Sequence, residues 1–335
     1  MKIFNFLIST VLFLNVSINA NLIERFRSWV NDFKIEIKND EHELVTFEKW
    51  VSNDKYIEIF NNNNNTFTLG HNQFSGMNSE DFKTYLGYSG EFQKNNLRKN
   101  YNSIDKSSLL TSINWIEKGG VTPVKDQGQC GSCWSFSTTG GLEGAYFVKY
   151  GTLLSFSEQQ LVDCDNFKNG GKDHGCNGGL MDNAFTWVGK NGGLCLESSY
   201  PYVSGVTETD GTCQKTCEIN TKSKVQSFID VEPNSDSSMM SALSINPVSI
   251  AIEADQKEFQ LYKSGVFTSS CGTNLDHGVL TVGYGTMDDK DYYIVKNSWG
   301  NTWGVNGYIY LGRGSEYNSG AGQCGMLMEG SYPVL

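Results

Sequence analysis

Cysteine is absent from the first 129 residues of this 335-residue chain, and all nine cysteines lie between Cys130 and Cys324. The odd number excludes complete pairing within one chain, because eight cysteines can form disulfides in an oxidising compartment and one is left over. The leftover thiol indicates a reactive cysteine or a bridge to another molecule.

Long apolar runs and positive charge are also scarce. Beyond the first twenty residues no segment has about eighteen uninterrupted apolar residues, so we expect a soluble mature protein without a membrane span. Residues 109–335 carry 14 lysines and arginines against 24 acidic residues, and the net charge of the chain is −11. This balance argues against nucleic acid or an anionic membrane as a partner, although a solvated acidic surface explains it equally well.

The first twenty residues have the layout of a signal peptide. Lys2 precedes an apolar run from Ile3 to Ile18, and the small Ala20 stands where a signal peptidase would cut. A buried N-terminal helix is the alternative, but Lys2 and the short apolar run favour a signal peptide over residues 1–20. We therefore expect entry into the secretory pathway and a lysosomal or extracellular location, where disulfides can form.

Two amphipathic helices are predicted next. Apolar side chains recur every three or four positions over residues 22–37 and 44–60. The asparagine run 61–65 ends the second helix, because short amide side chains compete for backbone hydrogen bonds. Asn64-Asn65-Thr66 in this loop is a glycosylation sequon with Asn64 as the acceptor.

An extended segment at residues 67–74 and a short helix capped by Asn78 and ending near Gly87 complete this region. Residues 22–87 are thus predicted to form a small cysteine-free helical unit. The polar segment 90–108 is predicted to be a cleavable linker.

The rest of the chain has a helical half and a strand-rich half. Apolar periodicity predicts helices at 132–149, 157–163 and 180–190. Strands are predicted from about residue 224 onward, at Val248–Ala254, Val279–Tyr284, Tyr292–Lys296 and Gly307–Leu311.

The densest motif runs from Gln127 to Trp134 and contains Cys130-Gly131-Ser132-Cys133. Two cysteines at this spacing can form a redox dithiol, or half of a zinc site that Cys213 and Cys217 would complete. Both alternatives are disfavoured, because structural zinc pairs usually lie closer in sequence and no thioredoxin-like strand precedes the motif.

Cys133 falls in the first turn of a predicted helix, where the helix dipole stabilises a thiolate, and a thiolate nucleophile needs a partner base. Of the four histidines, His42 and His71 lie in the N-terminal unit and His174 lies in a Gly/Asp loop. His277 directly precedes an apolar strand and is the candidate base. A lone histidine beside a strand is commonly structural, so this role depends on its surroundings.

These residues resemble the papain family of cysteine proteases, and most closely its cathepsin L subgroup. The resemblance covers nearly the whole chain. It rests on Gln127 to Trp134, Cys176-Asn177-Gly178-Gly179, Tyr200-Pro201-Tyr202, Asp276-His277-Gly278 and Lys296-Asn297-Ser298-Trp299-Gly300. It implies an α+β papain-like fold with a helical left domain, a β-rich right domain and a cleft between them, preceded by a helical inhibitory propeptide. The implied division is a signal peptide (1–20), a propeptide (21–108) and a mature peptidase domain (109–335).

The resemblance also implies the roles of individual residues. Asn297 would bond the far nitrogen of His277, with Trp299 shielding that bond from water. The side-chain amide of Gln127 and the backbone N–H of Cys133 would face the oxyanion of the tetrahedral intermediate. The substrate-binding residues implied in this way are Gly178, Gly179, Leu180, Met181, Ala251, Leu275, Asp276, Gly278 and Trp299.

Glu329 departs from the cathepsin L pattern, which has a small apolar residue five positions beyond Cys324. In the pocket for the second residue on the acyl side, the apolar walls would favour Leu or Phe, and a carboxylate at its floor would pair with a substrate arginine. The alternative is that Glu329 points into solvent from a surface strand.

The disulfides implied by the resemblance are Cys130–Cys176, Cys271–Cys324, and Cys164 with either Cys213 or Cys217. Cys195 and the remaining thiol of that last pair depart from the family pattern. A fourth disulfide between them would leave Cys133 alone unpaired, but spacing does not decide the connectivity.

The propeptide motifs match with three departures. The helix motif is present as Trp50, Asn53, Ile57 and Asn61, and the following motif as Gly70, Asn72 and Phe74. His42 and Thr46 stand where the family has Glu and Arg, and Gly76 stands where it has Asp.

The resulting prediction is a cysteine endopeptidase that hydrolyses peptide bonds through a thioester acyl-enzyme. It would be made as a zymogen and act at acidic pH in protein degradation, as a monomer without metal or other cofactor. Expected partners are protein and peptide substrates, its own propeptide and cystatin-type inhibitors. The rival functions are a catalytically silent papain-fold protein that binds peptides or serves as storage, and an intracellular redox or zinc protein.

Overall fold

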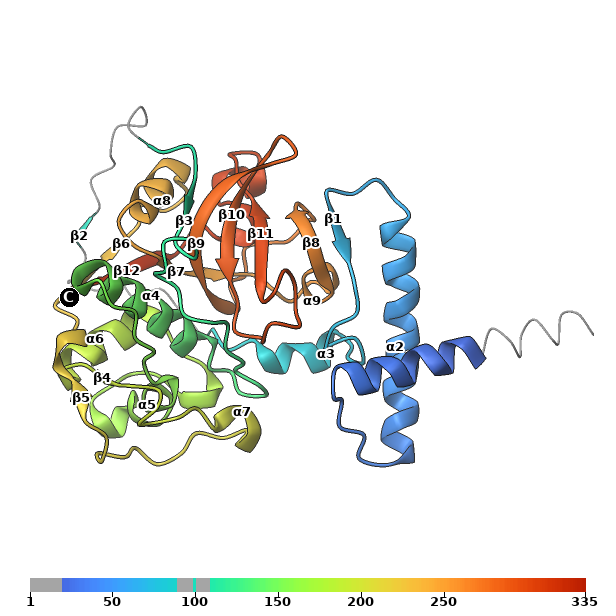
Figure 1. The fold of residues 1–335 in the computed structure, drawn as a ribbon, viewed down its shortest axis with the longest axis horizontal. Helices are drawn as coiled ribbons and strands as arrows, with labels where there is room; N and C mark the ends of the chain where they lie inside the picture. The colour runs from blue at the N-terminus through green and yellow to red at the C-terminus, as the bar shows by residue number, and fades with distance from the viewer. Residues whose placement is uncertain (1–19, 89–98, 101–108) are drawn as a thin grey trace, which may run out of the picture.

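The structure is a computed structural model that describes residues 20–88, 99–100 and 109–335. The predicted signal peptide, apart from its last residue, and most of the predicted linker lie outside the described residues. In Figure 1 an N-terminal unit, residues 20–88, packs against one side of a larger C-terminal unit, residues 109–335. No helix in the described part of the chain combines the length and apolarity needed to cross a membrane.

Two crossing helices form the N-terminal unit. Residues 20–32 are helical, and α2 spans Asp40–Asn61, so both predicted helices are confirmed. α2 begins earlier than its apolar pattern, because the Asn39 side chain accepts a hydrogen bond from the backbone N–H of His42. Where the helices cross, Phe26, Trp29 and Trp50 are buried in a small aromatic core.

The N-terminal unit then runs toward the C-terminal unit. The extended prediction holds only for β1 (Phe67–Leu69), and the residues after it form a turn. In this turn the side-chain amide of Asn72 donates to the carbonyl of Gln260 in the C-terminal unit, at 2.8 Å. Asn78 caps α3 (Ser79–Phe82) in a capping box with Asp81, and a 3₁₀ turn, η1 (Lys83–Tyr85), follows.

The helical domain of the C-terminal unit is cross-linked by disulfides. Its helices are α4 (Cys133–Tyr150), α5 (Glu158–Cys164), α6 (Met181–Asn191) and α7 (Ser204–Thr207), so the three predicted helices are confirmed. It also contains the small sheet of β4 (Leu194–Cys195) and β5 (Ile219–Asn220). Its disulfides are Cys130–Cys176, Cys164–Cys213 and Cys195–Cys217. The fourth disulfide, Cys271–Cys324, lies in the β-rich domain. Cys133 is the one free cysteine of the described residues.

The β-rich domain is built on a sheet that the N-terminal unit extends. Its strand order is β1-β8-β11-β10-β9-β7-β12-β6-β2, with β3 also pairing with β9. The remaining strands are β2 (Lys99–Asn100), β3 (Ile113–Asn114), β6 (Ser227–Asp230), β7 (Val248–Ile252), β8 (Tyr262–Phe267), β9 (His277–Met287), β10 (Lys290–Lys296), β11 (Tyr308–Gly312) and β12 (Gly330–Val334). Two helices, α8 (Asp236–Leu243) and α9 (Lys257–Gln260), accompany them. All four predicted strands are present, and β1 adds an antiparallel edge strand against β8.

The two domains meet along α4, which packs against β9 (Figure 1). The Ser137 hydroxyl of α4 donates to the carbonyl of Val279 in β9 at 2.7 Å. Because α4 begins at Cys133 and β9 begins at His277, this contact brings the predicted nucleophile and base to the same end of the domain interface.

Candidate active site

Cys133 lies at the first position of α4, and its side chain is completely buried. Its sulfur accepts a hydrogen bond from the backbone N–H of Gly278, at 3.3 Å, and Gly278 directly follows His277. The other eight cysteines form disulfides, so Cys133 carries the one free thiol of the described residues.

His277 is held by two neighbours from the loop after β10. Its Nε2 lies 2.8 Å from Oδ1 of Asn297, and its ring stacks on the indole of Trp299 with ring centroids 4.6 Å apart. Nδ1 of His277 has no hydrogen-bond partner among the described residues. The Asn297 contact and the Trp299 cover fix the orientation of the ring.

Both groups are neutral in this state. Burial raises the pKa of the Cys133 thiol to about 11, although backbone N–H groups of Gly278, Gly87 and Trp134 favour the thiolate. Burial also lowers the pKa of His277 to about 4, against the opposing effect of its bond to Asn297. Cys133 is therefore a thiol in this state. Desolvation raises its pKa by more than the helix dipole lowers it.

The side chain of Gln127 is completely buried next to the backbone of Cys130. Its Nε2 donates to the carbonyl of Tyr85 at 2.8 Å and to the carbonyl of Cys130 at 3.0 Å. Its Oε1 accepts from the Ser298 hydroxyl at 2.6 Å, which identifies Nε2 as the end that faces the site. The donor predicted for an oxyanion thus binds a carbonyl of the N-terminal unit.

A short backbone segment of the N-terminal unit, from Tyr85 to Tyr88, crosses the site. The N–H of Gly179 donates to the carbonyl of Gly87 at 3.2 Å, and the N–H of Tyr88 donates to the carbonyl of Asp276 at 3.0 Å. Tyr88 pairs in parallel with Gly179 as an isolated bridge. The segment therefore bonds to both walls of the cleft, one from each domain.

Tyr88 also places its ring against the apolar cluster that includes Met181 and Ala251, with Leu275 packed on the same cluster. The Tyr88 hydroxyl donates to Oε2 of Glu329. The backbone of Glu329 joins this wall, because its carbonyl accepts from the N–H of Ala251 at 3.1 Å. Six of the predicted substrate-binding positions thus surround the crossing segment: Gly179, Met181, Ala251, Leu275, Asp276 and Glu329.

The other predicted positions lie around this group. Leu180 is half-buried at the N-cap of α6. Gly178 is buried with φ of 105°, a conformation that favours glycine. At Gly278 a Cβ would lie 3.2 Å from Sδ of Met181 and 3.3 Å from the backbone of Trp134, so glycine lets the two walls approach. Asn64 lies away from the site, exposed in the loop after α2.

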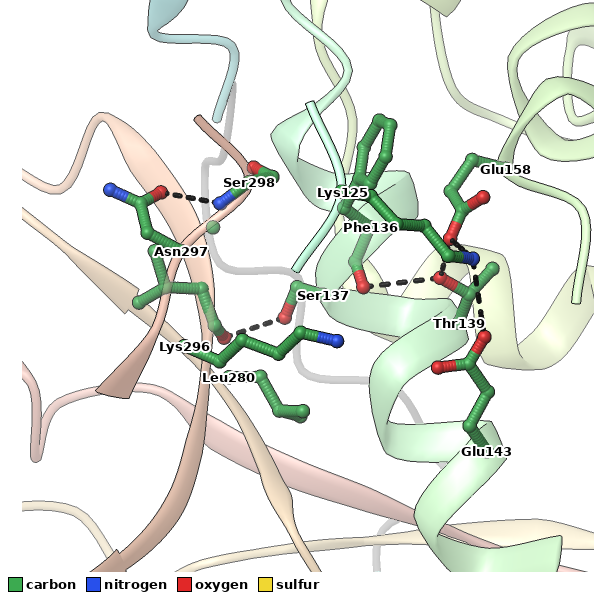
Figure 2. Close-up of a pocket in the computed structure, with 12 residues that line it drawn as sticks. Lys125, Phe136, Ser137, Thr139, Glu143, Glu158, Leu280, Lys296, Asn297 and Ser298 are labelled. Carbon is green, nitrogen blue, oxygen red and sulfur yellow. Dashed lines mark hydrogen bonds and ion pairs between the residues drawn. The ribbon is translucent and has the colours of Figure 1, made fainter. Parts of the chain in front are cut away.

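Sequence reasoning missed a group of buried charges behind the site. Figure 2 shows Lys125 between Glu143 and Glu158, with Lys296 extending toward them from the β10 side. Nζ of Lys125 lies 3.3 Å from Glu143 and 2.6 Å from Glu158. Burial lowers the pKa of Lys296 to about 8. These residues line a cavity of about 20 Å³ that extends to Asn297 and has room for one water molecule.

Tyr85, Gly87 and Tyr88 were also missed as site residues. The only signal in the sequence is indirect: a glycine beside two tyrosines at the end of a predicted helix. At Gly87 a Cβ would lie 2.0 Å from the carbonyl oxygen of Gly131, so no other residue fits this crossing without a shift of the backbone.

Comparison with known proteins agrees with this geometry. The model of the papain family of cysteine proteases matches residues 109–334, and the model of the cathepsin propeptide inhibitor domain matches residues 26–82. A senescence-specific cysteine protease of Oryza sativa subsp. indica is 39% identical over 323 residues, which cover 95% of this chain and 92% of that protein.

Two solved precursor structures have the same fold. A recombinant stem bromelain precursor has a TM-score of 0.84 and 36% sequence identity, covering 94% of this chain and 99% of that one. Digestive procathepsin L 3 from the larval midgut of Tenebrio molitor has a TM-score of 0.81 and 34% identity, covering 94% and 99%. These findings confirm the two-domain papain-like fold and the helical propeptide. The chain belongs to the papain family, and it is a cathepsin L-like cysteine endopeptidase with an inhibitory propeptide.

Proposed function

We propose that Cys133 is the nucleophile, His277 its base, Asn297 the group that orients His277, and Gln127 the oxyanion donor. The observation that carries this proposal is a convergence on one stretch of backbone, Tyr85 to Tyr88. Gln127 and Gly179 donate hydrogen bonds to carbonyl groups of this stretch, and the stretch donates one to the carbonyl of Asp276. The backbone N–H of Gly87, in the same stretch, bonds to Sγ of Cys133. A substrate peptide would use the same bonds.

Removal of the propeptide would let water reach the pair, which lowers the pKa of Cys133 and raises that of His277. A proton then moves from the thiol to the imidazole. The thiolate attacks the scissile carbonyl carbon, and the oxyanion is stabilised by Nε2 of Gln127 and the N–H of Cys133. As the C–N bond breaks, His277 gives its proton to the leaving amine, and a thioester remains. Water activated by His277 releases the acid and regenerates the thiol.

The proposed substrate is an extended peptide whose backbone bonds to Gly179 and Asp276. Its second residue on the acyl side would enter the pocket that Tyr88 fills, where Met181, Ala251 and Leu275 favour a bulky apolar side chain. The hydrogen bond from Tyr88 to Glu329 supports a carboxylate facing this pocket, which would also accept an arginine.

The proposed organisation is a signal peptide (1–20), a propeptide (21–108) and a mature enzyme (109–335), which the matched ranges 26–82 and 109–334 support. The enzyme would act at acidic pH in a lysosome or outside the cell, as a monomer that cystatin-type proteins inhibit. The exposed Asn64 would carry a glycan. The precursor would be inactive at neutral pH, and equal peptidase activity before and after removal of residues 21–108 would contradict this.

The test is labelling of the mature protein with a thiol-reactive peptide epoxide. One equivalent bound at Cys133, with loss of turnover, supports the protease. If the folded protein is not labelled, it is a catalytically silent peptide binder. If several cysteines are labelled and the labelling depends on metal, it is a zinc protein.

A further inference from the structure

Two aspartates, Asp165 and Asp173, are buried side by side in the loop that leads to the Gly178–Leu180 wall of the cleft. Asp165 is 0% exposed and Asp173 is 2% exposed. The backbone N–H of Asp173 donates to the carbonyl of Asp165 at 3.1 Å, and the two side chains are in hydrogen-bond contact. Two ionised carboxylates in such contact repel strongly when water is excluded, so such a pair retains a proton.

We propose that Asp165 and Asp173 share one proton, and that this pair positions the cleft wall for substrate binding. Oδ1 of Asp173 accepts from the N–H of Leu180 at 3.1 Å and from Nδ2 of Asn183 at 3.0 Å. Oδ1 of Asp165 accepts from the N–H of Lys172 at 3.2 Å. Oδ2 of each carboxyl group is buried without a hydrogen-bond donor among the described residues, which leaves these two oxygens for the shared proton.

Gly179 links this pair to the cleft. A Cβ at Gly179 would lie 2.8 Å from Cγ of Asp173 and 2.6 Å from the ring of Trp134, which follows the nucleophile in sequence. The backbone N–H of the same residue donates to the carbonyl of Gly87 at 3.2 Å. A displacement of Asp173 therefore moves the N–H that a substrate carbonyl would use.

The charges around the pair set the direction of its response to pH. Burial raises the pKa of both groups, that of Asp165 to about 6, and Lys190 of α6 opposes this at Asp165. Lys172 and His174 of the same loop are exposed, and Asp210 lies against Gly175. Asp165 therefore ionises first, above about pH 6, while Asp173 keeps the shared proton, because Asp165 raises the pKa of Asp173 further; the shared proton is lost when the pH passes the pKa of Asp173. The two carboxylates then repel, and the pair no longer stabilises the loop.

The inference rests on the proposed binding of the substrate backbone by Gly179. For the mature enzyme, the KM of a peptide substrate should rise by roughly tenfold as the pH rises from about 6 past the pKa of Asp173, while the pH dependence of kcat reflects the titration of Cys133 and His277. Asp165→Asn supplies a permanent N–H donor to Asp173, so its KM should vary little over this range. Asp288→Asn, the same change in the turn between β9 and β10, should retain the wild-type profile. Coincident KM profiles for Asp165→Asn and the wild type would overturn the inference.

A second measurement requires no turnover, so it separates failure of this inference from failure of the proposed function. The full-length Cys133→Ala precursor would be labelled with ¹³C at its aspartate carboxyl groups and titrated by NMR. We expect a resonance with a midpoint above about pH 6 that disappears in Asp165→Asn and persists in Asp276→Asn. The second variant is needed because burial also raises the pKa of Asp276, to about 7. If no such resonance depends on Asp165, the pair holds no shared proton.

Discussion

Thr46 lies directly against Gly76: a Cβ at Gly76 would be 2.7 Å from Cγ2 of Thr46. These are positions at which the related propeptides are expected to carry arginine and aspartate, so the two departures face each other. The space is closed by the indole of Trp29, whose edge is also 2.7 Å from that Cβ position. Neither position carries a charge in this chain, and apolar atoms of Thr46 and Trp29 fill the space between them.

A different polar cluster lies nearby and gives the propeptide a response to pH. Nε2 of His71 lies 3.0 Å from Oδ1 of Asp54, which also pairs with Arg25, and the His71 ring stacks on Trp50 at 4.7 Å. Burial lowers the pKa of His71 below its usual 6.5, although Asp54 favours the protonated form. The unfolded propeptide therefore binds a proton at higher pH than the folded one. The free energy of unfolding should fall as the pH drops below about 6.5 and level off below the folded pKa.

His71→Gln should remove this dependence and shift the midpoint of the acid-induced unfolding of the propeptide to lower pH. His42→Gln is the control, because His42 lies in the same unit near the exposed start of α2. The measurement is acid-induced unfolding of the propeptide in the full-length Cys133→Ala precursor, which cannot cleave itself, followed by tryptophan fluorescence as the pH is lowered. Identical profiles for the two variants would show that His71 does not carry the response.

Cys133→Ala and Cys133→Ser should lower turnover by about four to six orders of magnitude while folding is retained, because this thiol forms no disulfide. Asn297→Ala should have a milder effect, because it removes the orientation of His277 and leaves the base in place. Steady-state kinetics after assisted removal of the propeptide would measure both, with circular dichroism as the folding control. Wild-type turnover in the Cys133 variants would refute the assignment of the nucleophile.

Gly87→Ala should give the uncleaved precursor measurable peptidase activity at neutral pH. The added methyl group would meet the Gly131 carbonyl, so the crossing segment must move away from the sulfur of Cys133. Such overpacking costs about 1–3 kcal/mol, which corresponds to roughly a 5- to 150-fold gain in peptidase activity of the uncleaved chain. The initial rate on a fluorogenic peptide measures this gain. Lys83→Ala, at an exposed position of the same unit, should remain as silent as the wild type.

Glu329→Ala and Glu329→Gln should reduce the preference for Arg-Arg over Phe-Arg peptides by roughly tenfold or more, because a charge-assisted bond to the guanidinium is lost. The measurement is kcat/KM for both peptides. Glu258→Gln is the matched control, because Glu258 contacts Tyr56 of the propeptide and not the cleft. An unchanged ratio in both Glu329 variants would place that carboxylate outside the pocket.

Replacing both Cys195 and Cys217 by serine should lower the free energy of unfolding of the mature enzyme by about 3 kcal/mol, the loop-closure value for a separation of 22 residues. The bond lies beside the β4–β5 pair and away from Cys133, so kcat/KM should change little. Urea unfolding monitored by fluorescence would measure the loss. An unchanged urea midpoint would mean that this disulfide contributes no stability.

The sequence predicted those parts of the fold that local patterns determine. The amphipathic helices and the strands from Val248 to Leu311 follow from apolar periodicity, and Asn61 ends α2 as expected. The pairing of β1 with β8 was not predicted, because it joins residues nearly 200 positions apart. Local propensity can indicate that a segment is extended, but it does not indicate which distant strand it pairs with.

The site shows the same division. Cys133, His277 and Gln127 lie in dense motifs and could be proposed as site residues from the sequence, whereas Tyr88 and Asp173 could not. A tyrosine after a glycine, and an aspartate in a glycine-rich loop, look like ordinary surface residues. Their surroundings become apparent only when Tyr88 meets Glu329 and Asp173 meets Asp165 across distant parts of the chain.

The bonds from Tyr88 to Asp276 and Glu329 belong to a segment that is covalently joined to the enzyme it blocks. A tethered inhibitor acts at an effective concentration on the order of millimolar, whatever the amount of protein present. If the chain is cut at the proposed boundary, between Tyr88 and residue 109, occupancy of the cleft will depend on the real concentration of the released propeptide. Dilution of the released propeptide then makes activation effectively irreversible. In the uncleaved precursor, by contrast, even a propeptide with weak intrinsic affinity can inhibit the enzyme.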